Sequence, residues 1–184
     1  MKKLMISAAL LAAMSAPALA EQPSYNYVGL GYFQGGESGL DYDGFQIDGS
    51  VAFDEDWFGV ASYGTADIDG FDGDFSLFSV GVGYTQPMSA TSSWYASASL
   101  VRAEIDTNFG SIDDTGYGLE AGIRDRSMGD IELGASLGYI DVFDDTDTAL
   151  SGYAMYHINE QFALIVDLST ADTYDFGFGA RFHF

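Results

Sequence analysis

Apolar and polar residues alternate at every second position along most of this chain, which is the period of a β-strand and not of a helix. Segment 45–53 is the clearest case. One of its faces carries Phe45, Ile47, Val51 and Phe53, and the other carries Gln46, Asp48, Ser50 and Ala52. The same alternation is clear at 78–85, 117–124, 131–139 and 175–184 and weaker at 28–33 and 163–168. Small residues on both faces leave the facing open at 57–66, 93–105 and 150–158.

The breaks between these segments are of two kinds, which follow one another in turn along the chain. Short breaks lie at 54–56, 87–92, 125–129 and 159–161; longer Asp/Gly-rich ones lie at 35–42, 67–74, 106–114 and 143–149, with a tight one at 171–173. The pattern predicts ten strands of roughly 9–11 residues, the length that a tilted strand needs to cross a bilayer. Merging 150–158 with 162–170 into less regular structure would give eight strands instead.

The chemistry of the two faces favours a membrane barrel over a soluble β-sandwich. The polar face is rich in Gly and Ser with isolated charges, which suits the crowded interior of a narrow barrel. The apolar face carries aromatic residues near the segment ends, where their rings can sit at the boundary between lipid and water. Because unpaired backbone groups are costly in hydrocarbon, the sheet must close on itself. The sequence therefore predicts an all-β, closed, antiparallel, up-and-down transmembrane β-barrel; a soluble sandwich would separate with the periplasm or medium on fractionation.

Residues 1–20 have the three-part pattern of a secretory signal peptide. Lys2 and Lys3 are followed by an uncharged apolar stretch and then by Ala18-Leu19-Ala20. We therefore expect cleavage after residue 20, which leaves 21–184 as one barrel domain. The apolar stretch is too short to span a bilayer as a helix, which needs about 20 residues.

The charge balance after residue 20 is strongly acidic. Four arginines face 28 aspartates and glutamates, and both lysines of the chain lie in the predicted signal peptide. This balance argues against nucleic acid as a partner, because phosphate contacts need Lys and Arg. The chain has no cysteine, so neither disulfides nor thiol chemistry can contribute.

The last segment alternates apolar and aromatic residues and ends in Phe182-His183-Phe184. This ending is similar to the terminal strand of bacterial outer-membrane barrels, so the whole chain after residue 20 resembles the small, porin-type barrels of the OmpX and opacity-protein kind. The resemblance implies an outer-membrane location with lipid and lipopolysaccharide around the barrel, loops outside the cell and both termini in the periplasm. It also implies that Phe182 and Phe184 form a signal for the outer-membrane assembly machinery. The best-known members of those families have eight strands, and the lack of lysine after residue 20 is unusual.

The sequence contains no clear catalytic motif. We therefore expect a protein that is not an enzyme and needs no cofactor. His157 and His183 both lie at the short-turn end of the predicted barrel, and no G-x-S-x-G motif occurs. The spacing of Asp67, Asp69, Asp72 and Asp74 could hold Ca²⁺ or Mg²⁺ through oxygen ligands, although polar, solubilising loops explain it as well. Divalent ions could also bridge such loops to lipopolysaccharide phosphates.

Charged residues on the polar face are expected to point into the lumen. We predict an internal ionic network that blocks free flow, formed by Arg102, Glu104, Glu120, Arg124, Asp167 and Arg181. The expected function is a structural or surface-interaction role, such as envelope integrity or adhesion, with acidic extracellular loops. The alternative is a narrow passive channel for small solutes or cations.

Overall fold

The computed structural model describes residues 22–37, 40–68, 73–107, 110–170 and 174–184, so the predicted signal peptide 1–20 lies outside the described residues. Ten strands make up the fold: β1 (Tyr27–Glu37), β2 (Leu40–Ala52), β3 (Trp57–Ile68), β4 (Gly73–Pro87), β5 (Ser92–Thr107), β6 (Gly110–Met128), β7 (Ile131–Val142), β8 (Asp145–His157), β9 (Phe162–Thr170) and β10 (Tyr174–His183). Within these residues, no helix is long and apolar enough to cross a membrane.

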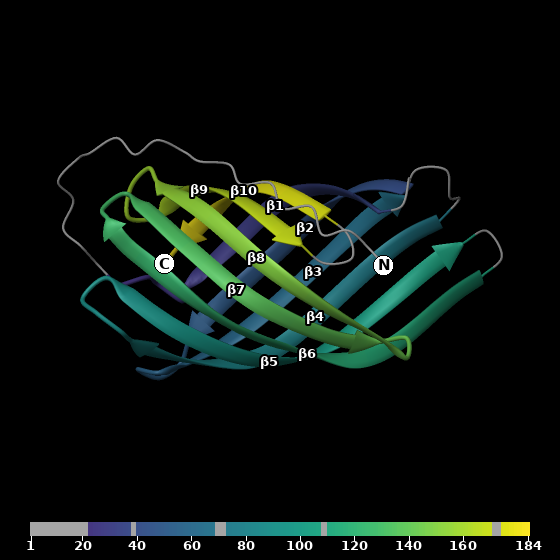
Figure 1. The fold of residues 1–184 in the computed structure, drawn as a ribbon, viewed down its shortest axis with the longest axis horizontal. Coiled ribbons are helices and arrows are strands. Elements are labelled where there is room, and N and C mark those ends of the chain that lie inside the picture. Colours follow the sequence, from purple (N-terminus) through teal and green to yellow (C-terminus); the bar gives the residue numbers. More distant parts are fainter. Residues whose placement is uncertain (1–21, 38–39, 69–72, 108–109, 171–173) are drawn as a thin grey trace.

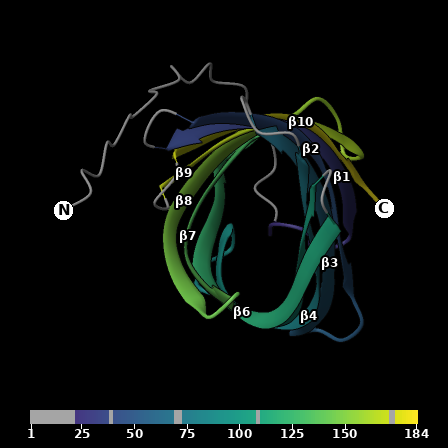
Figure 2. The same cartoon turned by 90° about the vertical axis from the view of Figure 1, so that its right-hand side faces the viewer.

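Each strand pairs antiparallel with its neighbours in sequence, and β1 pairs with β10, so the sheet is a closed barrel (Figure 1). The closing ladder runs from Tyr27 opposite His183 to Gly36 opposite Tyr174. Seen from one end, the strands form a complete ring around a central space (Figure 2). The predicted fold class is confirmed, with ten strands and not eight.

The two ends of the barrel differ in their connections. At one end, here called the turn end, short turns at 53–56, 88–91, 129–130 and 158–161 join the strands. At the other, here called the loop end, the strands reach much further than the sequence predicts. β1 extends to Glu37 and β2 begins at Leu40, inside the predicted break 35–42. That prediction was wrong because Asp and Gly side chains can stay in water while their backbone groups remain paired in the ladder.

The outer wall of the barrel is apolar. Leu30, Leu100 and Leu137 point away from the lumen and are 63%, 65% and 57% exposed. The structure also shows which residues face outward in 57–66, 93–105 and 150–158, where the sequence did not decide it. Tyr63, Leu100 and Leu150 lie on the outer wall, so every second residue from each of them faces outward too. An apolar wall of this extent would be an association surface in water, whereas in a bilayer it faces hydrocarbon.

Aromatic side chains border this apolar wall on both sides. Towards the turn end, the Tyr84 ring lies 5.1 Å from Trp57 and 5.8 Å from Trp94. Towards the loop end, Tyr32 and Phe45 form an edge-to-face pair at 5.3 Å. Two such girdles are typical of strands that cross a membrane, because Tyr and Trp prefer its interfaces.

Candidate functional site

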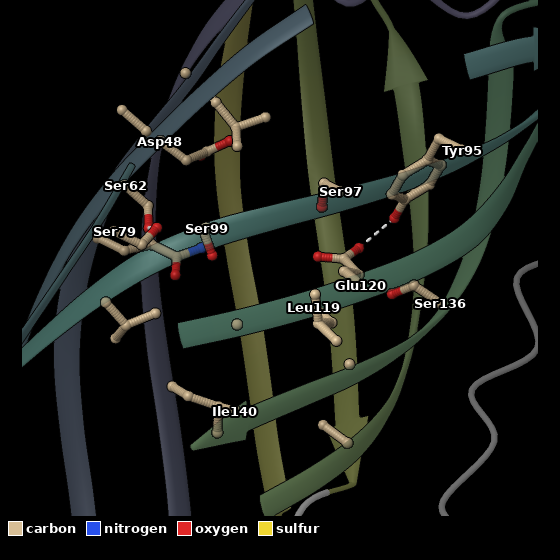
Figure 3. A pocket seen from close by; sticks show the side chains of 18 of the residues that line it. Asp48, Ser62, Ser79, Tyr95, Ser97, Ser99, Leu119, Glu120, Ser136 and Ile140 are labelled. Carbon is tan, nitrogen blue, oxygen red and sulfur yellow. Dashed lines mark hydrogen bonds between the residues drawn. The ribbon is translucent and has the colours of Figure 1, made fainter. Parts of the chain in front are cut away.

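The barrel wall surrounds a cavity of about 480 Å³ with both polar and apolar lining residues. Side chains from most strands line it, including the carboxylates of Asp48, Glu120 and Asp167 and the guanidinium groups of Arg124 and Arg181. Serine hydroxyls from β3, β4, β5 and β7 add further polar groups (Figure 3). Because these residues come from inward positions on many strands, the lumen is the candidate functional site.

A buried ionic cluster fills the turn end of the lumen. Glu132 on β7 is 0% exposed and Arg124 on β6 is 4% exposed. Nη2 and Nε of Arg124 lie 2.7 and 2.8 Å from Oε1 of Glu132. The same oxygen accepts a hydrogen bond of 2.6 Å from the Tyr153 hydroxyl, which in turn accepts one of 3.0 Å from Arg124 Nε. The two opposite charges lie in direct contact through Oε1, which offsets part of the cost of burying them, whereas Oε2 of Glu132 accepts no hydrogen bond among the described residues.

Two histidines extend this cluster from β8 towards β10. Nε2 of His157 lies 3.4 Å from the second carboxylate oxygen of Glu132. The His183 ring lies 5.3 Å from the His157 ring, and both residues are at least nine-tenths buried. Met155 and Phe58, which point into the same end of the lumen, are buried to a similar degree. Water therefore has little access to the turn end of the lumen.

Glycines make room for the large inward side chains. A Cβ at Gly134 would lie 2.1 Å from the Tyr153 ring, and one at Gly83 would lie 2.1 Å from the Phe58 ring. Each of these rings lies flat over a glycine of a neighbouring strand. The Gly-rich inner face is therefore a packing surface for a few large residues.

A second charged pair lies on the β1–β2–β10 side. Nη2 of Arg181 lies 3.2 Å from Oδ2 of Asp48, and the guanidinium stacks 3.7 Å from the Tyr27 ring centroid. Asp167 borders the same cavity and lies over Gly177, whose Cβ would meet its carboxylate at 2.4 Å. The cavity thus has carboxylates on both sides of one arginine.

Glu120 projects into the open part of the cavity. The Tyr95 hydroxyl donates a hydrogen bond to Glu120 Oε1, and Ser97 and Ser136 flank the pair (Figure 3). The Ser62 and Ser79 hydroxyls are joined at 2.7 Å on the adjoining β3–β4 part of the wall. This arrangement can bind water, hydroxyl groups or cations.

The structure brings four of the six predicted network residues together: Glu120, Arg124, Asp167 and Arg181 line the cavity. The prediction for Arg102 and Glu104 was wrong. Both share the parity of the outward-facing Leu100, and Arg102 pairs instead with Asp113 at 3.2 Å, with both side chains more than half exposed. The facing of 93–105 could not be read because alanine and serine occupy both sides of β5.

The principal partner of Arg124 was not predicted. Glu132 shares the inward face of β7, but the sequence contains no signal that it lies beside Arg124 across the β6–β7 ladder. Tyr25 was also missed as a residue of the lumen; in the structure it precedes β1. Its ring centroid lies 4.6 Å from the Arg124 guanidinium.

The predicted cation site is described only in part. Asp67 and Asp74 face each other across the β3–β4 ladder, whereas Asp69 and Asp72 lie outside the described residues. Within the described part of the chain, no group of three or more His, Cys, Asp or Glu is placed to hold a metal ion. Ca²⁺ or Mg²⁺ binding therefore stays a prediction.

The two C-terminal phenylalanines lie on the outer wall. Phe182 packs against Phe162 with ring centroids 5.1 Å apart, and Phe184 is 61% exposed. Their position at the end of the closing strand is compatible with recognition during assembly, and that role stays a prediction.

The sequence matches a protein family over nearly its whole length. Residues 6–184 match the family described as outer membrane protein beta-barrel domain. The chain belongs to this family. It is therefore an outer-membrane β-barrel protein, as the resemblance of its last strand suggested. No curated protein matches the sequence.

Several solved structures share the barrel fold. The translocator domain of autotransporter NalP from Neisseria meningitidis has a TM-score of 0.50 at 10% identity, over 88% of this chain and 90% of that chain. The attachment invasion locus protein Ail of Yersinia pestis has a TM-score of 0.43 at 22% identity, over 85% and 97% of the two chains. The KdgM porin has a TM-score of 0.45 at 13% identity, over 85% and 99%. These similarities concern the fold and do not select a function.

Proposed function

We propose that this protein is a non-enzymatic outer-membrane barrel with a structural or surface-interaction role, and that its lumen is closed to diffusion. The observation that carries this proposal is the complete burial of Glu132, held by Arg124 and Tyr153 at the turn end of the lumen. An open pore would leave such a carboxylate in water. Both histidines of the chain are buried in the same region and face no open cleft where a substrate could reach them.

In this proposal the turn end faces the periplasm and the loop end faces the outside. Short periplasmic turns and longer extracellular extensions are the usual arrangement in such barrels. The proposed orientation places both ends of the chain in the periplasm.

The closed lumen is tested by electrical recording. Purified barrel inserted into a planar lipid bilayer is expected to give no current steps above the bilayer background in concentrated KCl. Resolved steps from the wild-type protein would support the second candidate function, a narrow channel, which the cavity of about 480 Å³ favours.

The acidic outer rim suggests how the surface role works. Asp43, Asp67, Asp74 and Asp113 are exposed beyond the apolar wall at the loop end. There they would lie level with lipopolysaccharide phosphates, and divalent cations would bridge the two layers of negative charge. The barrel is expected to bind lipopolysaccharide vesicles in Mg²⁺ and to lose this binding in chelator, and Asp67→Asn with Asp74→Asn should weaken it. Equal binding with and without chelator would contradict this role.

A further inference from the structure

The segment 22–26, here called the strap, lies across the turn end of the barrel. It precedes β1 and stands outside the strand ladders. Near β1, the Asn26 side chain accepts a hydrogen bond of 2.8 Å from the backbone N–H of Ala52. At the other end of the strap, Nε2 of Gln22 donates to the carbonyl of Ser89 in the turn between β4 and β5. Because the β4–β5 turn lies three to four strands away from β1 around the ring, the strap crosses part of the opening.

Tyr25 fills the space that remains beside the ionic cluster. Its ring stacks on Phe58 at 4.3 Å on one side, and the Arg124 guanidinium lies 4.6 Å from its centroid. Its hydroxyl accepts a hydrogen bond of 3.0 Å from Thr85 Oγ1 and lies 3.3 Å from Ser93 Oγ. This single side chain therefore contacts β3, β4, β5 and β6 from within the lumen.

These contacts can be broken without breaking the barrel. The strap is held by side-chain packing and a few hydrogen bonds, whereas the wall is held by continuous backbone ladders. After the predicted cleavage at residue 20 the strap becomes the end of the chain, and a chain end with few such ties is the usual place for local opening.

The cavity behind Tyr25 has a surplus of carboxylates. Asp48, Glu120, Asp147 and Asp167 line it, against Arg181 and the already paired Arg124. Rings of carboxylates inside a pore favour cations over anions.

We propose that the strap is a stopper with Tyr25 as its plug, and that its release opens a cation-preferring path through the barrel. This proposal rests on the closed lumen proposed above. It adds a conditional activity, the conduction of small inorganic cations, and assigns the part of the seal beside the ionic cluster to five residues outside the barrel wall.

The experiment compares Tyr25→Ala with Tyr156→Ala in planar bilayers under a KCl gradient. Tyr156 is a half-exposed tyrosine of the outer wall near the same end of the barrel, so it controls for the loss of a tyrosine. Tyr25→Ala is expected to give resolved current steps with a reversal potential shifted toward that of K⁺, while the wild type and Tyr156→Ala remain at background. Adding Glu120→Gln to Tyr25→Ala should keep the steps and reduce the shift.

A second variant guards against misfolding, since deletion of 22–25 removes Tyr25 and all of the strap except Asn26 and leaves every strand pair in place. A heat-dependent gel shift identifies correctly closed barrel in each sample. If both closed variants are as silent as the wild type, the stopper proposal is overturned while the closed lumen stands. If the wild type already conducts as well as the variants, the closed-lumen proposal fails. Steps that prefer Cl⁻ would contradict the assigned selectivity.

Discussion

At the residue scale, the inner face of this barrel packs large side chains against glycines of neighbouring strands. Tyr153 and Phe58 each lie over a glycine of the next strand, which leaves them free to reach into the lumen. The buried Arg124–Glu132 pair depends on the same geometry, because Tyr153 supplies one of its hydrogen bonds. Two predictions belong to this scale.

The first concerns the space beneath Tyr153. Gly134→Ala would place a methyl group 2.1 Å from the present ring position, so Tyr153 must move away from Glu132. We expect a loss of roughly 1–3 kcal/mol in the free energy of unfolding, measured by urea titration in lipid vesicles. Gly138→Ala is the control on the same face of β7, because its Cβ would meet nothing closer than 3.9 Å. Equal effects of both substitutions would refute the packing argument.

The second compares a buried and an exposed ion pair. Glu132→Leu leaves the Arg124 guanidinium buried without its carboxylate and should cost about 3–5 kcal/mol in unfolding free energy. Asp113→Leu removes the partner of Arg102 from an exposed pair and should cost about 0–1 kcal/mol. Replacing Arg124 and Glu132 together should recover much of the loss. A double variant as unstable as the single one would show that the charge left behind is not the cause.

At the element scale, the strands differ in length, and the turn between β7 and β8 has an unusual backbone conformation. β5 and β6 are the longest strands and run far beyond the apolar wall, whereas β7 and β8 are shorter. A turn of two residues, Phe143 and Asp144, joins β7 to β8. These two residues have φ of 57° and 56°, the left-handed values that a two-residue hairpin needs. The Phe143 N–H also donates a 2.6 Å hydrogen bond to Asp114, which fixes the turn against β6.

This turn can therefore be improved. Asp144→Gly removes the left-handed strain from an exposed residue and should raise the free energy of unfolding by about 1 kcal/mol. Gly129→Ala is the control in the opposite direction. Gly129 has φ of 75° in the turn before β7, so alanine there should lower the free energy of unfolding by a similar amount. Urea titrations of the two variants should move in opposite directions. A loss of stability in Asp144→Gly would mean that the aspartate side chain makes a contribution larger than the strain.

At the scale of the whole molecule, the barrel is arranged inside out relative to a soluble protein. Its buried charges meet in the lumen, and many of its leucines, valines and phenylalanines cover the outside. Lipid is the solvent in which this arrangement is stable, because the apolar wall then faces hydrocarbon and every wall strand has a paired neighbour.

The position of the bilayer on this wall can be measured with the native tryptophans. The chain has two, Trp57 and Trp94, and both lie on the outer wall near the turn end. Their fluorescence should be quenched by brominated lipids, and more strongly when bromine lies near the headgroup than when it lies at the bilayer centre. Trp57→Phe leaves Trp94 as a single reporter. Quenching by aqueous iodide in place of brominated lipid would contradict the assigned outer wall.

The wall of the barrel could be predicted from the sequence because its signal is local. Alternation with a period of two follows from strand geometry, and it assigned the outward face of 45–53, 78–85 and 131–139 correctly. It also gave ten strands, since each short turn interrupts the pattern. It failed for Arg102 and Glu104, where small residues on both sides of β5 removed the contrast between faces.

The contents of the lumen were decided by the tertiary structure. Which inward charges meet depends on the stagger between neighbouring strands and on the closure of the ring, and neither leaves a local trace in the sequence. The pairing of Arg124 with Glu132 and the reach of Tyr25 across the opening both follow from that three-dimensional arrangement. The sequence by itself thus determined a membrane-spanning wall, because facing is a property of each strand. Only the folded barrel determined which side chains pack at the turn end of its lumen, because such packing requires side chains from distant strands to occupy the same space.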